Sequence, residues 1–202
     1  MKQKTTSLFA IGILALATMI TTTINAKEAV NPIAATYKHR NVYEQQAPKK
    51  VIISGNVEVT LVQDYESKKL FSNDGTVKAR VYSDDNAIYV SAKKTNETAK
   101  ITLYVANIYR IDISGNAVVN TKNTLNTQHL QLILQDSAKA DISSKTESLF
   151  TKLSNESDLK LNGATGLHAI STNELATLNT KNFRALKTEV EKRNSTDYAK
   201  VK

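Results

Sequence analysis

The chain has no cysteine and no tryptophan, and its 202 residues include only two prolines and three histidines. The absence of cysteine excludes disulfides, thiolate metal sites, thiol nucleophiles and cysteine-linked lipid anchors. The three histidines leave few imidazole ligands for a metal site. What the chain does have is 41% hydrophobic and 23% charged residues, which is enough to bury the core of about one domain.

The two prolines, Pro32 and Pro48, lie close to the N-terminus. Residues 27–49 show no apolar periodicity, and we interpret them as a leader or cap segment. From Lys49 onward there is no proline, which is typical of central strands whose backbone N–H groups all donate hydrogen bonds. We therefore expect residues 50–202 to form one domain.

Residues 1–26 have the pattern of a secretory signal peptide. Lys2 and Lys4 precede an uncharged, mainly apolar run from Leu8 to Ile20, and small and polar residues follow as far as Ala26. The run is shorter than the roughly 20 residues of a membrane-spanning helix, so we predict cleavage after Ala26 rather than a permanent anchor. The protein is then expected in the periplasm, on the cell surface or outside the cell, without a lipid anchor.

The formal charge of +8 at pH 7 falls to +6 when the predicted signal peptide is removed. The excess of basic residues is concentrated between Lys181 and Lys202. Such a charge favours contact with anionic glycans, lipopolysaccharide phosphates or membrane surfaces, although it can also serve solubility alone. An exported chain without a basic motif interleaved with aromatic residues is not expected to bind nucleic acid.

Apolar and polar residues alternate through much of the chain with a period of two, as they do in half-buried strands. Val57, Val59 and Leu61 form one such series, and Ile101 and Leu103 begin another. Clusters of Asp, Asn, Ser and Gly separate the series and favour turns. The pattern predicts an all-β fold built from short strands.

A repeat of about nineteen residues follows in the second half of the chain. Its first column has a nearly constant spacing and consists of Ile111, Leu130, Leu149, Leu167 and Leu186. Each repeat holds two strands and two polar bends, the length of one coil in a β-solenoid whose like positions stack about 4.8 Å apart. We predict a single-stranded β-helix (β-solenoid) with coils of about nineteen residues, preceded by short β-strands. A β-sandwich of short strands is the alternative.

One segment recurs with high similarity: Ile53–Val59 (ISGNVEV) returns later in the chain as Ile113–Val119 (ISGNAVV). Each copy is a strand that ends at a glycine-assisted bend, at Gly55 and at Gly115. Here the chain resembles the GIN domain, the head domain of autotransporter-type adhesins that is frequent in exported proteins of the Bacteroidota. The resemblance covers roughly Lys49 to Asn179. It implies a β-helix that binds a glycan or a cell-surface protein, and it transfers no catalytic or binding residues.

The residues offer little support for catalysis, for a cofactor or for a metal. His39, His129 and His168 are too dispersed to predict a shared metal site. The chain contains neither the G-x-S-x-G elbow of a serine hydrolase nor a phosphate-binding loop. A carbohydrate-active β-helix enzyme, a polysaccharide lyase or hydrolase, would need paired carboxylates. Its candidates are Asp112, Asp136, Asp141, Asp158 and Glu174. We interpret these as ordinary polar residues on outward strand positions, and we predict a protein that is not an enzyme.

Four tyrosines lie in the first strand region: Tyr82, Tyr89, Tyr104 and Tyr109. Tyr82 and Tyr104 each follow an inward apolar residue, so both are expected to face outward and to form a candidate ligand surface. Tyrosines that merely cover a sheet face are the alternative. The resulting hypothesis is an exported, non-enzymatic adhesin. A carbohydrate-active enzyme and a periplasmic structural accessory remain as alternatives, and the oligomeric state stays open.

Overall fold

The computed structural model describes residues 49–84, 86–92 and 97–192, which all belong to one compact unit, Asn31–Lys202. The predicted signal peptide and nearly all of the predicted leader therefore lie outside the described residues. The described part of the chain is all-β and contains no helix. Accordingly, it has no helix that is long and apolar enough to cross a membrane.

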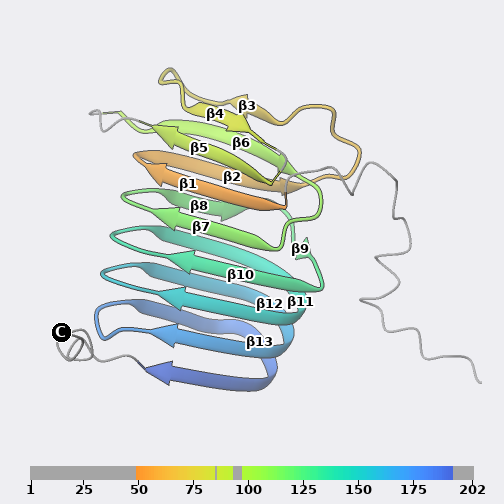
Figure 1. Cartoon of the computed structure of the whole chain (residues 1–202), viewed down its shortest axis with the longest axis vertical. Coiled ribbons are helices and arrows are strands. Elements are labelled where there is room, and N and C mark those ends of the chain that lie inside the picture. The colour runs from red at the N-terminus through yellow and green to blue at the C-terminus, as the bar shows by residue number, and fades with distance from the viewer. Residues whose placement is uncertain (1–48, 85, 93–96, 193–202) are drawn as a thin grey trace, which may run out of the picture. The chain divides into compact units, whose positions relative to one another are not determined.

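Thirteen strands form one sheet (Figure 1). Their bounds are β1 Lys50–Gly55, β2 Val57–Gln63, β3 Phe71–Asn73, β4 Arg80–Ser83, β5 Ala87–Ala92, β6 Ala99–Val105, β7 Arg110–Ser114, β8 Val118–Thr121, β9 Leu125–Asn126, β10 His129–Leu134, β11 Lys139–Leu153, β12 Asp158–Thr172 and β13 Thr177–Lys192. The all-β class predicted from the alternation is confirmed.

The sheet has two faces that the three long strands join. One face runs β4–β5–β1–β7–β10, and the other runs β3–β6–β2–β8. The first part of β11 pairs with β8, and its last part, Ser148–Leu153, pairs with β10. β12 and β13 follow β11 around the same bend. The sheet therefore wraps nearly closed, like a barrel, around a single core (Figure 1).

Alternation decides which residues enter the core. In β2 and β6 every second residue is buried. Val59 lies beside Ile101 and Leu61 beside Leu103 on neighbouring parallel strands, and all four are essentially inaccessible to water. Each fully buried side chain of this size contributes about 1.5–3 kcal/mol relative to its exposed state, so these stacked apolar columns are the main source of stability.

The two copies of the recurring segment are neighbours in the sheet. Ile53 lies beside Ile113 and Ser54 beside Ser114, because β1 pairs in parallel with β7. Between these copies the chain forms β3 to β6, but β5 and β6 add to the far edges of β1 and β2 (Figure 1). The two copies are therefore far apart in the sequence because β5 and β6, which come between them, pair with the edges of β1 and β2 that face away from β7 and β8. The order of the strands in the sheet thus differs from their order in the chain.

The predicted columns are correct at one step and wrong at another. Leu130 lies beside Leu149, the next member of the column, as expected. Ile111, however, lies beside Leu132 and not beside Leu130. The additional residues belong to the segment around β9, which lengthens this turn of the chain by two positions. Both leucines are buried on the inner face of β10, so the sequence could not distinguish them.

The later part of the column is wrong as well. Leu149 lies beside His168, and Leu167 is only half-buried on the outer side. His168 is the inward residue, with 2% of its surface exposed, and its Nε2 is 3.1 Å from Oγ1 of Thr151. Leu186 is 87% exposed. Polarity alone predicts Leu167 in the core at this place, whereas the hydrogen bond with Thr151 allows His168 to be buried there.

Burial has a direct electrostatic effect on His168. Desolvation lowers its pKa to about 4 from an ordinary value of 6.5, because a charged imidazole is disfavoured in the core. The ring also meets Phe183 edge-on, at 5.4 Å between ring centres. His168 therefore stays neutral in the folded protein at neutral pH.

Two glycines of the bends tolerate no side chain. Gly55 has a φ of 87° and Gly115 a φ of 71°, conformations that residues with a Cβ rarely adopt. A Cβ on Gly55 would also overlap the carbonyl oxygen of Ala92 on the neighbouring strand. Close stacking and backbone conformation thus require glycine at the same place.

We predict that Gly55→Ala lowers the free energy of unfolding by at least about 2 kcal/mol, because it adds left-handed strain and a backbone clash. Gly75→Ala is the matched control. Gly75 has an ordinary φ, and a Cβ added there would lie 3.6 Å from its nearest neighbouring atoms. Urea denaturation followed by circular dichroism would compare the two variants. Equal effects on the unfolding midpoint would contradict the assignment.

We also predict that lowering the pH from 7 to 4 destabilises the protein through His168. The unfolded chain binds a proton near pH 6.5, while the folded chain binds it only near pH 4. The contribution of neutral His168 to the free energy of unfolding is therefore complete above pH 6.5. It is lost as the pH falls, by about 3 kcal/mol in total. In denaturation series at several pH values, His168→Leu should lack this part of the slope, and exposed His129→Gln should keep it. Parallel curves for the wild type and His168→Leu would refute the prediction.

Candidate ligand-binding surface

Tyr82 and Tyr89 form a stacked pair on the outer surface. β4 and β5 are antiparallel, and their register sets Tyr82 opposite Tyr89 and Val81 opposite Val90. Val90 is buried, so the tyrosines of the same hairpin point to the other side of the sheet. Their ring centres are 4.5 Å apart and their planes differ by 6°. Tyr82 is 54% exposed, on the strand that ends this face of the sheet.

Asp84 fixes the bend that brings the two tyrosines together. Its Oδ1 accepts the backbone N–H groups of Asn86, at 2.9 Å, and of Ala87, at 2.7 Å. These two hydrogen bonds, the one from Ala87 first, lower the pKa of the Asp84 carboxyl. Desolvation, followed by the negative charge of Asp84, raises the pKa of Tyr89. The hairpin therefore holds the pair, and Tyr89 is uncharged at neutral pH.

On the outer surface of the sheet, Tyr89 is followed by Ile52 and then by Asp112, which occupy the paired positions on the neighbouring parallel strands β1 and β7. We call Tyr82, Tyr89 and Ile52 the tyrosine platform. Asp112 at its inner end accepts a hydrogen bond from Nε of Arg110 at 2.7 Å and forms an ion pair with Lys50 at 3.1 Å. The contact with Asp112 raises the pKa of Arg110. The platform thus combines an aromatic and apolar surface with a neighbouring group of charges.

The structure separates the two tyrosines that the sequence grouped. Tyr104 lies in β6 beside Val62, on the face formed by β3, β6, β2 and β8, while Tyr82 lies on the other face. Tyr104 is also only partly exposed. The sequence contained a signal for the actual partner. The turn-forming residues 83–86 predict a hairpin, and counting outward from it sets Tyr82 opposite Tyr89.

Asp136, one of the candidate acids, is a structural residue of a bend. Its φ is 63°, and Asn155 at the next bend has a φ of 59°. The Asp136 carboxylate accepts the backbone N–H of Gly115 and the side-chain amide of Asn155, each at 3.1 Å. It therefore connects successive bends of the chain.

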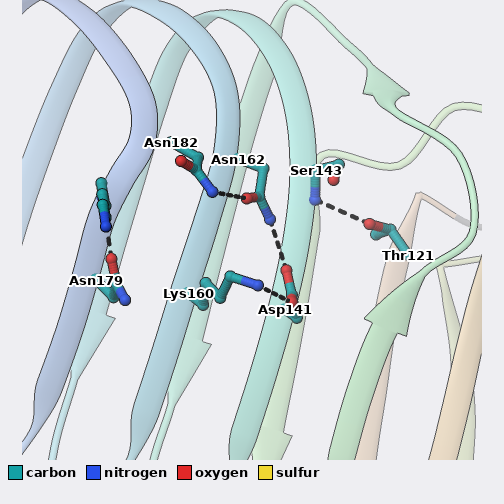
Figure 2. A network of polar contacts seen from close by, with 8 residues as sticks. Thr121, Asp141, Ser143, Lys160, Asn162, Asn179 and Asn182 are labelled. Atoms are coloured by element: carbon teal, nitrogen blue, oxygen red, sulfur yellow. Dashed lines mark hydrogen bonds and ion pairs between the residues drawn. The ribbon is translucent and has the colours of Figure 1, made fainter.

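Asp141 belongs to a polar ladder on the opposite face (Figure 2). It binds Nζ of Lys160 at 2.7 Å and accepts the amide of Asn162 at 2.6 Å. Asn162 in turn accepts the amide of Asn182 at 3.4 Å. Polar side chains thus connect β11, β12 and β13 through contacts between directly paired and diagonal positions (Figure 2). Asp112 and Asp141 lie on different faces, on β7 and on the first part of β11, so they do not form a catalytic pair.

Two open grooves lie near the last strands, with volumes of about 430 and 360 Å³. The larger one contains Lys181 and Arg184 and no carboxylate, and the smaller one contains one acid, Glu147. Neither matches the two converging acids of a glycosidase. Within the described ranges no three His, Asp or Glu side chains are placed to hold a metal ion. His39 lies outside them, and His129 is exposed while His168 is buried.

Solved structures share this fold at low sequence identity. A structure described as a putative adhesin from Bacteroides fragilis NCTC 9343 has a TM-score of 0.65 at 20% identity, covering 75% of this chain and 74% of its own. A putative adhesin from Parabacteroides distasonis ATCC 8503 has a TM-score of 0.53 at 10% identity, with 73% and 75% covered. A putative lipid binding protein of that strain has a TM-score of 0.51 at 8% identity, with 73% and 75% covered. No curated protein matches the chain.

The family comparison agrees with the geometry. The model described as a putative auto-transporter adhesin, head GIN domain, matches residues 47–199, a range that contains the whole described sheet. The resemblance seen in the recurring segments Ile53–Val59 and Ile113–Val119 is thereby confirmed. The chain belongs to the family of auto-transporter adhesin head GIN domains.

Proposed function

We propose that this protein is an exported, non-enzymatic binding module and that the tyrosine platform contacts its ligand, a glycan or a protein surface. The observation that carries the proposal is the stacked Tyr82–Tyr89 pair, in which Tyr82 is exposed and Tyr89 is half-buried. Aromatic rings contribute a large contact area and lose little conformational entropy on binding. The apolar face of a sugar ring and an apolar protein side chain both fit such a ring.

The proposal extends to the architecture. We infer a β-solenoid with coils of about nineteen residues, supported by the parallel register of β11 and β12, in which the offset between partners is constant. Between Lys160 and Asn162 a bulge shifts the register, and beyond it the offset to the β13 partners increases by one position. In this arrangement a signal peptide at 1–26 and a leader at 27–49 precede the domain at 50–202. Stacked coils form a rigid support for the platform.

A role in adhesion fits the placement of charges better than catalysis does. The candidate acids Asp112, Asp136 and Asp141 all have structural partners, and neither of the two grooves described above contains any of them. A catalytic pair needs one carboxyl with a raised pKa within about 5–9.5 Å of the other. The family is consistent with export, and the periplasm, the cell surface and the exterior are the compartments we propose.

Tyr82→Ala is predicted to weaken ligand binding roughly tenfold, because it removes the exposed ring of the platform. The measurement is binding to an array of neutral and anionic glycans and to immobilised cell-surface proteins. Tyr109→Ala is the matched control, since Tyr109 is 45% exposed and lies outside the platform. Tyr104→Ala tests the other face. If Tyr82→Ala binds as the wild type does and remains folded, the platform is not the site. If the wild type itself binds nothing on these arrays, a structural accessory in the periplasm becomes the better interpretation.

An assay of polysaccharide turnover distinguishes the binding proposal from the enzyme alternative. The binding proposal predicts that the wild type releases no reducing ends or unsaturated products from a panel of polysaccharides. Asp112→Asn should lower only stability, because it weakens the contacts with Lys50 and Arg110. The effect should be about 1 kcal/mol, as both partners are partly exposed. Turnover by the wild type that Asp112→Asn or Asp136→Asn abolishes would refute the binding proposal.

A further inference from the structure

The last strand, β13, leaves one edge of the sheet open. It has 16 residues and pairs with β12 alone among the described strands. Figure 1 shows it at the end of the sheet opposite β3 and β4. The backbone N–H and C=O groups of such an edge can pair with another strand, and natural proteins usually shorten or cover edges of this length.

The core is also open at this end. Thr188 and Val190 lie beside the inward residues His168 and Ile170 of β12. Nothing among the described residues lies beneath them, and Val190 is 56% exposed. Phe183 is only partly buried against the core. An additional strand under β13 would cover these side chains in the way that β13 covers those of β12.

β13 carries basic residues along its whole length, whereas both of its acids lie in its second half. The basic residues are Lys181, Arg184, Lys187 and Lys192, and the acids are Glu189 and Glu191. Lys187 forms an ion pair with Glu189 of the same strand at 2.6 Å. Two β13 strands that run antiparallel, with Leu186 at the centre, set Lys181 of each copy opposite Glu191 of the other. Twofold symmetry makes this contact twice. Opposite charges that face each other across antiparallel strands stabilise the pairing.

The bend of β13 fits the same register. The pairing with β12 skips Leu186, between Ala185 and Lys187, where the strand turns from one face of the sheet to the other. Leu186 is 87% exposed there. A twofold axis at Leu186 places the bend of one β13 strand beside the bend of the other. Each face of the sheet in one copy is then extended by a face of the sheet in the second copy. The opposite end of the sheet offers no such match, because β3 and β4 have only 3 and 4 residues.

We propose that a second copy of this chain covers the open edge, and that the protein forms a twofold homodimer through antiparallel pairing of β13. The proposal does not depend on the identity of the ligand. Because β4 and β13 end opposite sides of the sheet, the dimer carries its two tyrosine platforms at its two far ends. Two such sites on one particle would increase avidity for a surface with repeated ligands.

The test is the mass of the full chain in sedimentation velocity and light scattering across a concentration series. We expect a dimer whose dissociation constant rises roughly tenfold with either Lys181→Glu or Glu191→Lys, because each reversal creates two like-charge contacts. The double variant restores the opposite charges and should dimerise as the wild type does. Both residues are exposed, so the variants should fold.

Lys78→Glu is the control, since Lys78 is an exposed lysine between β3 and β4, at the other end of the sheet. It should leave the dissociation constant unchanged. A chain that stays monomeric at every concentration overturns the proposal and leaves residues 193–202 as the candidate cover for β13. A dimer that neither reversal weakens, or that the double variant does not restore, overturns the β13 register as well.

Discussion

The whole structure depends on one constraint, the stacking of parallel strands so that equivalent apolar residues lie directly above one another. Strands about 4.8 Å apart place Ile53 on Ile113 and Leu61 on Leu103, and a pair of strands alone could not bury these side chains. With no cysteine available for cross-links, burial of these columns carries the stability. Every other feature must leave that stacking intact.

The bends show how the constraint uses polar residues. Gly55, Gly115, Asp136 and Asn155 all adopt positive φ, and the last two combine this conformation with hydrogen bonds between successive bends. Asn and Asp tolerate the left-handed region better than other residues with a Cβ do. Acids and amides that look like candidates for catalysis are therefore needed to turn the chain. The proposed ligand contact lies instead on the outer face of the sheet, where Tyr82 is exposed.

The two ends of the sheet are unlike. At one end the short antiparallel strands β3 and β4 complete the faces, and the tyrosine pair belongs to this end. At the other end β13 presents sixteen residues and pairs with β12 alone among the described strands. The proposed ligand surface and the proposed dimer edge therefore lie at opposite ends of the sheet, because β13, the last described strand, has no further described strand beside it.

The sequence by itself determined the all-β class, the inward columns of β2 and β6, the bends at Gly55 and Gly115 and the family, because a period of two and repeated turn residues are local signals. Only the tertiary structure decided that β5 and β6 lie beyond β1 and β2, that His168 replaces Leu167 in the core, and that Tyr104 lies on a different face of the sheet from Tyr82. These outcomes depend on which strands become neighbours and on hydrogen bonds across them, and a one-residue change of register exchanges the two faces of a strand.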